Sequence, residues 1–279
     1  MNRKGMTLIE LLVALSISGI LVAGVYRTFV SQQHTYTVQE QVVDMQQNVR
    51  LAINRMTREI RMAGFGKMDA TFFGHGAMYG TFSNVVNPGV DDHSVTIVAG
   101  YQTLIPTTMS LNATTGDSSI FLNDVSGFDT GVKQYISING LECHRIQQII
   151  GKEIKFAGWD KLTNNHLAGD NTPTNPGEPV YLVMAITYSI GPFEGKSCLL
   201  RDDHLGSGPQ PVAENIDDLQ FAYFDANGNS TANPPDIRMI QLNLIARTDK
   251  TDPELAKVGD GFRRRTLTSN IQLRNLAFL

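Results

Sequence analysis

The sequence predicts an α+β fold in which one long N-terminal helix precedes an antiparallel β-sheet domain. The only charge between Gly5 and Arg27 is Glu10, and an apolar stripe at helical spacing continues beyond Arg27. Most of residues 65–279 alternates between short strand-like segments and turn residues. A helix followed by a run of strands favours an antiparallel sheet laid across the C-terminal half of that helix.

Residues 6–30 are predicted to form the membrane-spanning half of the helix. No charged residue lies between Leu11 and Tyr26, and at about 1.5 Å rise per residue this stretch forms a helix of nearly bilayer length. A carboxylate in such a run costs about 2.5–3.5 kcal/mol if it reaches the bilayer centre, so Glu10 needs a reason to be there. Its obvious partner is a cation.

Four interpretations of this N-terminal segment are open. A secretory signal has the same basic start but ends in a small-residue cleavage site, for which residues 22–24 are a poor candidate. A plain single-span anchor tolerates Glu10 poorly and does not explain Gly5, and a buried helix of a soluble protein does not explain the basic leader. In the fourth, the chain is cut after Gly5 and Met6 becomes the first residue.

The string from Gly5 to Leu15, GMTLIELLVAL, resembles the N-terminal processing motif of type IV prepilins. The resemblance implies that residues 1–5 are a leader, that a prepilin peptidase/methyltransferase cuts between Gly5 and Met6, and that it methylates the new N-terminus at Met6. The family usually has phenylalanine where Met6 stands. The resemblance also implies that Glu10 acts in filament assembly.

Charge places the body of the chain outside the cytoplasm. The basic leader precedes the span, and the formal net charge of −4 becomes −6 once Arg3 and Lys4 are removed. This distribution follows the positive-inside rule. A mildly acidic body does not favour nucleic acid as a partner.

Residues 31–64 predict an amphipathic second half of the helix. Its apolar stripe follows steps of three and four residues and consists of Val38, Val42, Met45, Val49, Ala52, Met56, Ile60 and Ala63. Gly64 and Gly66 are stop signals. Within the span, the small pairs Ala14/Ser18 and Gly19/Ala23 allow close helix packing, although membrane helices use more glycine in general.

Residues 65–279 predict the extracytoplasmic β-rich domain, with a β insertion at about 110–179. The strand-like segments are 94–99, 119–122, 134–138, 143–150, 153–156, 180–189, 198–201, 219–224, 237–246 and 266–276. Asn139-Gly140 predicts a hairpin turn inside the insertion.

No catalytic or metal-binding pattern is evident, and no cofactor is predicted. The histidines are scattered, without an HExxH motif or a short-spaced Cys/His set: His34, His75, His93, His144, His166 and His204. Residues 225–229 lack the glycine position and the distant glutamate of an EF-hand, so Asn227-Gly228 is read as a turn. Residues 263–265 form a local basic patch.

Cys143 and Cys198, the two cysteines, form a candidate disulfide. An extracytoplasmic location permits a bridge, which would stabilise by about 2–4 kcal/mol. Free buried cysteine is an ordinary small apolar residue, and the sequence does not fix the distance between the pair. Both states stay open.

Both ends of the chain resemble PilW-like minor pilins, and the central insertion is least covered. The matching segments are 46–50, 58–65, 213–225, 240–247 and 273–276. The resemblance implies a structural minor pilin, not an enzyme, which helps to initiate type IV pilus assembly and lies at or near the pilus tip, with links to twitching motility and cell adhesion.

The same resemblance implies partners and a location. The partners are other minor pilins and the major pilin through the helix, the assembly platform of the bacterial inner membrane, and membrane lipid. The chain is expected in that membrane before assembly and on the cell surface in the pilus afterwards. A J-type pseudopilin of type II secretion is the alternative, and an enzyme or ligand-binding receptor on a single-span anchor ranks third.

Overall fold

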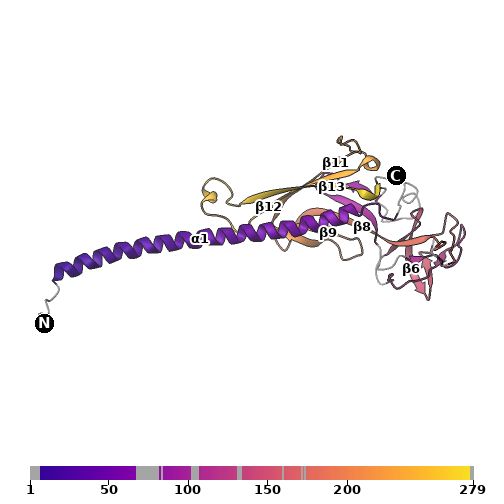
Figure 1. Cartoon of the computed structure of the whole chain (residues 1–279), viewed down its shortest axis with the longest axis horizontal. Helices are drawn as coiled ribbons and strands as arrows, with labels where there is room; N and C mark the ends of the chain where they lie inside the picture. The colour runs from indigo at the N-terminus through magenta and orange to yellow at the C-terminus, as the bar shows by residue number, and fades with distance from the viewer. Residues whose placement is uncertain are drawn as a thin grey trace. The chain divides into compact units, whose positions relative to one another are not determined.

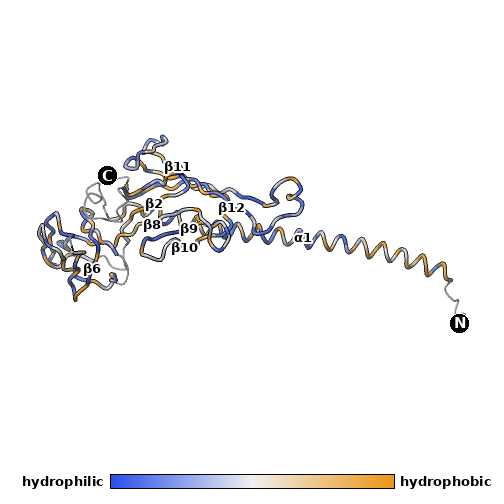
Figure 2. Tube along the Cα trace, turned by 180° about the vertical axis from the view of Figure 1, so that it is seen from behind, coloured by the Kyte–Doolittle hydropathy of each residue, from blue (hydrophilic) through white to orange (hydrophobic). Residues whose placement is uncertain are grey.

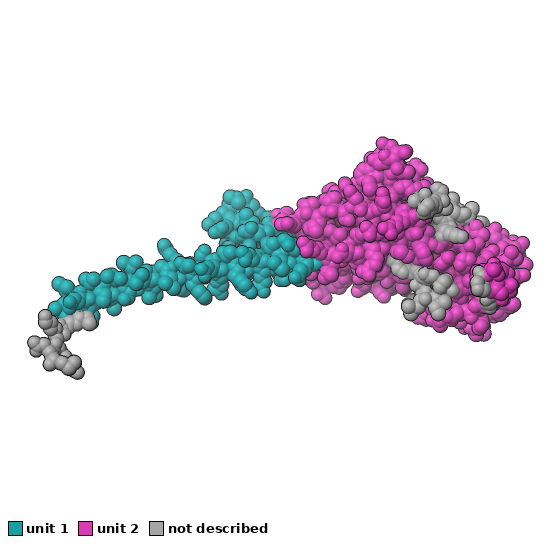
Figure 3. Space-filling view, in the orientation of Figure 1, with its two compact units in different colours: residues 1–47, 248–263 teal, residues 48–247, 264–279 magenta. Residues whose placement is uncertain are grey.

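The computed structural model describes residues 7–66, 82, 84–101, 107–130, 134–158, 160–170, 172 and 174–276. The chain divides into two compact units, coloured separately in Figure 3. Unit 1 comprises residues 1–47 and 248–263, and unit 2 comprises residues 48–247 and 264–279. Within the described residues, every pairing between named strands is antiparallel.

Unit 1 is built from most of helix α1 (Leu8–Arg61) and one long loop. Hydrophobic colour dominates the first half of α1 in Figure 2. By length and composition, α1 is the one described helix that could cross a membrane. The loop, residues 248–263, contains the short 3-10 helix η2 (Leu255–Lys257).

The last turns of α1 belong to unit 2, where their apolar stripe is buried. Val49, Ala52, Met56 and Ile60 are each at most 1% exposed. The helix ends at Arg61, and Gly64 and Gly66 follow with φ of +73° and +97°. Glycine adopts this left-handed backbone without the steric cost that a Cβ imposes. The predicted stripe is confirmed, and the glycines stand where the chain leaves the helix.

A ten-stranded sheet forms the larger part of unit 2. Its strands are β1 (Val86–Pro88), β2 (Val95–Tyr101), β3 (Thr107–Thr108), β4 (Ser119–Phe121), β5 (Tyr135–Ile138), β6 (Glu142–Ile150), β7 (Glu153–Phe156), β8 (Pro179–Phe193), β9 (Lys196–Asp202) and β10 (Gln210–Glu214). Strand β8 organises the sheet, since it pairs with β2 and β3 along one edge and with β5 and β9 along the other. Figure 1 shows β8 and β9 beside the end of α1.

The expected antiparallel β-sheet domain is confirmed, and its C-terminal strands form a second sheet of their own. The sheet consists of β11 (Ile216–Phe224), β12 (Met239–Arg247) and β13 (Arg264–Gln272). Buried and half-buried residues alternate strictly along β12, so one face of this sheet packs inward. Two 3-10 turns flank it, η1 (Pro234–Asp236) and η3 (Arg274–Leu276).

The insertion region has a hydrophobic core of its own. Buried residues between Met109 and Val180 make up this core, with Ile120, Ile136, Ile154 and Phe156 among them. Asn139 and Gly140 adopt φ of 51° and 77°, which confirms the predicted hairpin turn. Its strands β5, β6, β7 and β4 continue the ten-stranded sheet beyond β8.

Candidate functional site

The predicted cleavage site lies outside the described residues. Thr7 is the first residue that the structure describes, so Gly5 and Met6 have no structural account here. Cleavage between them and methylation of Met6 stay predictions.

Glu10 closes a capping box at the start of α1. Its Oε2 accepts hydrogen bonds from the backbone N–H and the hydroxyl of Thr7, each at 2.9 Å, and the Glu10 N–H donates to the Thr7 hydroxyl oxygen at 3.4 Å. Such reciprocal bonds satisfy donors that the first turn of a helix leaves unpaired. Oε1 receives no hydrogen bond from the described residues, so this oxygen is available to a cation.

The first half of α1 exposes its apolar side chains. Leu8, Ile20 and Val25 are 76%, 74% and 70% exposed, and no residue of the most apolar window is buried. A contiguous apolar surface of this extent marks contact with lipid or with other helices.

Small residues leave a shallow groove along this exposed helix. A Cβ built on Gly19 or Gly24 meets no atom within 4 Å. Around Gly24 lies a groove of about 510 Å³, lined by Ile20, Leu21, Gly24, Val25, Thr28, Phe29 and Gln32. A side chain of a neighbouring helix can enter such a groove. The predicted small pairs, Ala14/Ser18 and Gly19/Ala23, do not line it.

In unit 1, the 248–263 loop is fastened to α1 through Asp252. The Asp252 carboxylate accepts a hydrogen bond from Arg263 Nη2 at 2.6 Å and lies 3.7 Å from His34 Nε2. Hydrogen bonds from the Glu254 N–H and from Arg263 hold the pKa of Asp252 below its usual range. Arg263 and Arg264, expected as part of a basic patch, pair instead with Asp252 and Asp217.

In unit 2, Glu59 fastens the end of α1 to β8 and β9. Its Oε2 accepts hydrogen bonds from the Tyr188 hydroxyl at 2.6 Å and from Arg201 Nε at 3.0 Å. Asn275 Nδ2 donates to the carbonyl oxygens of Met62 and Ala63 at 3.3 and 3.1 Å, which caps the C-terminal end of the helix. Sequence reasoning missed these contacts, since their partners lie far along the chain.

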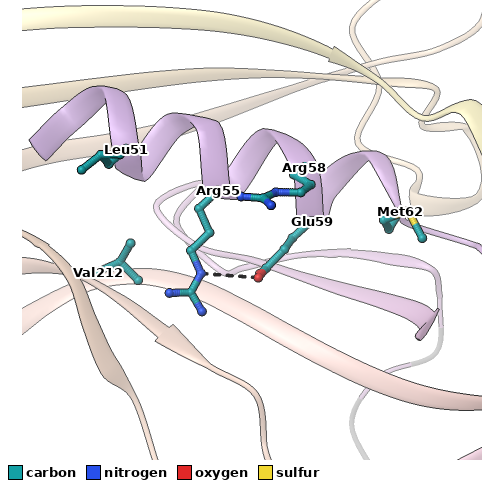
Figure 4. A pocket seen from close by; sticks show the side chains of 6 residues that line it. All are labelled: Leu51, Arg55, Arg58, Glu59, Met62 and Val212. Carbon is teal, nitrogen blue, oxygen red and sulfur yellow. Dashed lines mark hydrogen bonds and ion pairs between the residues drawn. The ribbon is translucent and has the colours of Figure 1, made fainter. Parts of the chain in front are cut away.

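A cavity of about 690 Å³ opens between the last turns of α1 and β10 (Figure 4). Its lining consists of Leu51, Arg55, Arg58, Glu59, Met62 and Val212. Arg55 and Glu59 form an ion pair at 3.5 Å in its wall. Glu59, the one carboxylate of its lining, is already bonded by Tyr188 and Arg201 as well as by Arg55.

The candidate disulfide between Cys143 and Cys198 is not formed. Both thiols are free and buried. In the strand register, Cys143 pairs with Ser137 of β5, which pairs with Tyr181 of β8, whereas Cys198 pairs with Gly191 of β8. The ten residues of β8 from Tyr181 to Gly191 span about 33 Å, far beyond the Cα separation of about 4.4–6.8 Å that a bridge requires. Burial raises the pKa of the Cys143 thiol.

The described residues contain no group of three or more His, Cys, Asp or Glu side chains arranged to hold a metal ion. His75 lies outside those residues. His144 and His166 are scattered in sequence but meet at Glu142 in the insertion, which sequence reasoning missed. Asp225 accepts the N–H groups of Asn227 and Asn229, which is the geometry of a turn.

Comparison with known proteins adds one motif and one structural likeness. Residues 1–26 match the family model described as the prokaryotic N-terminal methylation motif. No curated protein matches the chain. Among solved structures, a type IV-like pilin from Thermus thermophilus is similar, at 11% identity and a TM-score of 0.35, with 83% of this chain and 97% of that chain covered. The chain thus carries a prepilin-type N-terminal methylation motif on one long apolar helix, which is followed by antiparallel sheets.

Proposed function

We propose that this chain is a minor pilin that helps to initiate type IV pilus assembly and is incorporated at or near the pilus tip. The observation that carries the proposal is the prepilin-type motif over residues 1–26, joined to a helix whose apolar surface is exposed from Leu8 to Val30. Such a surface suits lipid before assembly and the helices of other subunits afterwards.

In this proposal, Glu10 guides docking between subunits. The capping box fixes its carboxylate at the first turn of α1 and leaves Oε1 open. The positive N-terminal amine of a neighbouring subunit, freed by cleavage after a glycine, would relieve the cost of holding that carboxylate in an apolar environment. Other minor pilins and the major pilin are the proposed partners along the helix.

In the proposed order of events, the chain is first inserted in the bacterial inner membrane. The prepilin peptidase/methyltransferase removes residues 1–5, and the assembly platform then draws the helix out of the lipid into the filament. The β-rich domain faces the periplasm before assembly and the cell exterior afterwards. No step in this sequence requires the chain itself to catalyse a reaction.

Glu10→Ala tests the assembly role. The variant keeps the apolar run, so we expect it to insert into the membrane normally but to copurify with other pilins much more weakly than the parent. Glu40→Ala removes an exposed carboxylate from the same helix and is the matched control. Equal recovery of Glu10→Ala and the parent in filaments or priming complexes would contradict the proposal.

Deletion of the gene distinguishes the two filament systems. Loss of surface pili with intact protein secretion supports the pilus assignment. Loss of secretion with normal piliation instead identifies a J-type pseudopilin and overturns the pilus assignment. The predicted cleavage after Gly5 is the same for both kinds of filament.

A further inference from the structure

Five ionisable side chains form a continuous row in the insertion, and all of them are buried except Glu178, whose side chain is 21% exposed. His144 lies between two carboxylates, with Nδ1 at 2.9 Å from Asp160 Oδ1 and Nε2 at 3.0 Å from Glu142 Oε2. His166 lies between two others, with Nε2 at 2.5 Å from Glu142 Oε1 and Nδ1 at 2.6 Å from Glu178 Oε2. Glu142 therefore stands at the centre of the row.

The centre of the row is shielded from water, and its central carboxylate accepts hydrogen bonds at both oxygens. Glu142, His144 and His166 are at most 1% exposed. Besides the two rings, Glu142 accepts the N–H and the hydroxyl of Thr163 at 2.9 Å each and the N–H of Asn164 at 3.1 Å. The His144 ring also stacks on Phe156, with ring centroids 4.3 Å apart. Leaving a buried ionised group in this row unpaired would be costly.

The geometry fixes the number of protons on the two rings. A neutral imidazole has one N–H donor and one lone pair, whereas a carboxylate only accepts. Because each ring faces a carboxylate from both nitrogens, a neutral ring would direct a lone pair at an oxygen. Where the facing carboxyl groups are ionised, only the doubly protonated ring satisfies both contacts.

We propose that this row is a proton-dependent lock, in which His144 and His166 are both imidazolium in the folded insertion and loss of their protons releases the 157–178 loop from β6. The row joins two parts of the chain, β6 and the loop. Glu142 and His144 lie on β6, whereas Asp160, His166 and Glu178 lie in the loop, with Glu178 directly before β8.

Among the described residues, the charged groups bonded to the two rings are these three carboxylates. The rings face Glu142 from β6 and face Asp160 and Glu178 from the loop, and β7 contributes the uncharged Phe156. Among the described residues, no lysine or arginine forms an ion pair with any of the three carboxylates. The two imidazolium rings are therefore the cations that balance this buried negative charge.

The pKa shifts agree in direction with this arrangement. Burial alone would lower the pKa of His144, but hydrogen bonds and charge from Asp160 and Glu142 outweigh it and raise the pKa above 6.5. His166 is raised in the same way by Glu142 and Glu178. Burial opposes ionisation of Glu142, yet His144, His166 and Thr163 hold its pKa far below 4.5.

The two histidines contribute fully to the stability of the folded insertion below about pH 6.5, the pKa of an unfolded histidine. This contribution is lost as the pH rises through their raised pKa values in the folded state. Glu142 contributes fully to this stability above about pH 4.5, and its contribution is lost as the pH falls toward its lowered pKa in the folded state. The lock is therefore strongest between these two limits and weakens in alkali.

The row supplies most of the hydrogen bonds between the loop and β6, whereas the loop's other hydrogen bonds run mainly to residues 112–117, from Leu162, Asn165, His166 and Ala168. The described residues of the loop form no named strand or helix, and those with buried side chains are Asp160, Leu162 and His166. Two of these three belong to the row. The loop also exchanges backbone hydrogen bonds with Ala113 through His166, so its release would free the neighbouring turn.

The test is a pH titration of the full chain in detergent micelles, from about pH 5.5 to about pH 9.5, read by nitrogen-15 NMR of the imidazole rings and by amide hydrogen exchange. We expect both rings to carry two protons at about pH 7. Above about pH 6.5, opening of the 157–178 loop should increase by up to about tenfold per pH unit for each proton lost. Amides of β11 and β12 provide the internal reference for base-catalysed exchange.

Variants separate the two rings. His166→Gln should reduce the pH dependence of loop opening to about one proton, because only His144 still titrates. His93→Gln, at a half-exposed histidine bonded to the Leu219 carbonyl oxygen, should leave it unchanged. A neutral ring at either position at about pH 7 in the parent, or loop exchange that follows the β11–β12 reference throughout, would overturn the proposal even if the variant fails to fold.

Discussion

Three carboxylates occupy positions where an unpaired charge would be expensive, and each is compensated differently. Glu10 is held by Thr7 within the first turn of α1. Glu59 is neutralised by Arg201 and bonded by Tyr188, and Glu142 is placed between two histidines. Glu10 keeps one oxygen free of the described residues, which is why we assign it the role that needs a partner chain.

Tyr188→Phe tests the contribution of the Glu59 contacts. The Tyr188 side chain is fully buried, and its hydroxyl donates to a carboxylate, so we expect the free energy of unfolding to fall by about 1.5–3 kcal/mol. Chemical denaturation of the full chain in detergent measures the change. Tyr36→Phe, at an exposed position on α1, should stay within about 0.5 kcal/mol of the parent.

Sequence reasoning identified Glu10 but missed Glu59 and Glu142, for one physical reason. A single charge in an apolar run is visible locally, because its cost does not depend on the rest of the fold. Glu59, by contrast, meets Tyr188 and Arg201 across sequence separations of 129 and 142 residues. Glu142 meets its partners Thr163, Asn164 and His166 only when the turn-rich loop folds back onto β6.

The helix was more predictable than the strands. Its apolar steps and terminal glycines are local signals, and the observed end at Arg61 lies just before the predicted stop at Gly64. Strands β1, β3 and β10 were missed. Two of them have only two or three residues, and β10 carries Pro211 and a register shift at the edge of the sheet.

Gly64→Ala tests how α1 is terminated. Its φ of +73° is unfavourable for alanine, and the added Cβ would approach Leu276 Cδ2 to 2.7 Å. We expect a loss of about 1–2 kcal/mol in the free energy of unfolding from the backbone alone. Gly158→Ala places its Cβ where nothing lies within 4 Å, so it is the matched control. Equal stability of the two variants would show that the positive φ is not required.

At the scale of the whole molecule, the pairing of strands could not be predicted. Strand β8 joins β2, β5 and β9, which come from three separate parts of the chain, and alternation within a strand does not specify its neighbours. The division into two sheets follows from these distant pairings. The insertion could be predicted from the sequence because its hairpins are local and its strands contain enough apolar residues for a separate core.

The same topology decides the state of the cysteines. Because the sheet separates Cys143 from Cys198, we expect two reactive thiols per chain in denatured, unreduced protein. A quantitative thiol assay measures them, with prior reduction as the control for total cysteine. Finding none without reduction, and two after it, would contradict the strand register.

The central claim is that this chain is processed and assembled as a filament subunit, and the mature N-terminus tests it most directly. Intact-protein and N-terminal peptide mass spectrometry should be compared between cells with and without the prepilin peptidase. We expect the chain from peptidase-positive cells to begin at a methylated Met6 and that from peptidase-negative cells to begin at Met1. A chain that still begins at Met1 in peptidase-positive cells, or that begins near Val25 as after a secretory signal, would contradict the account.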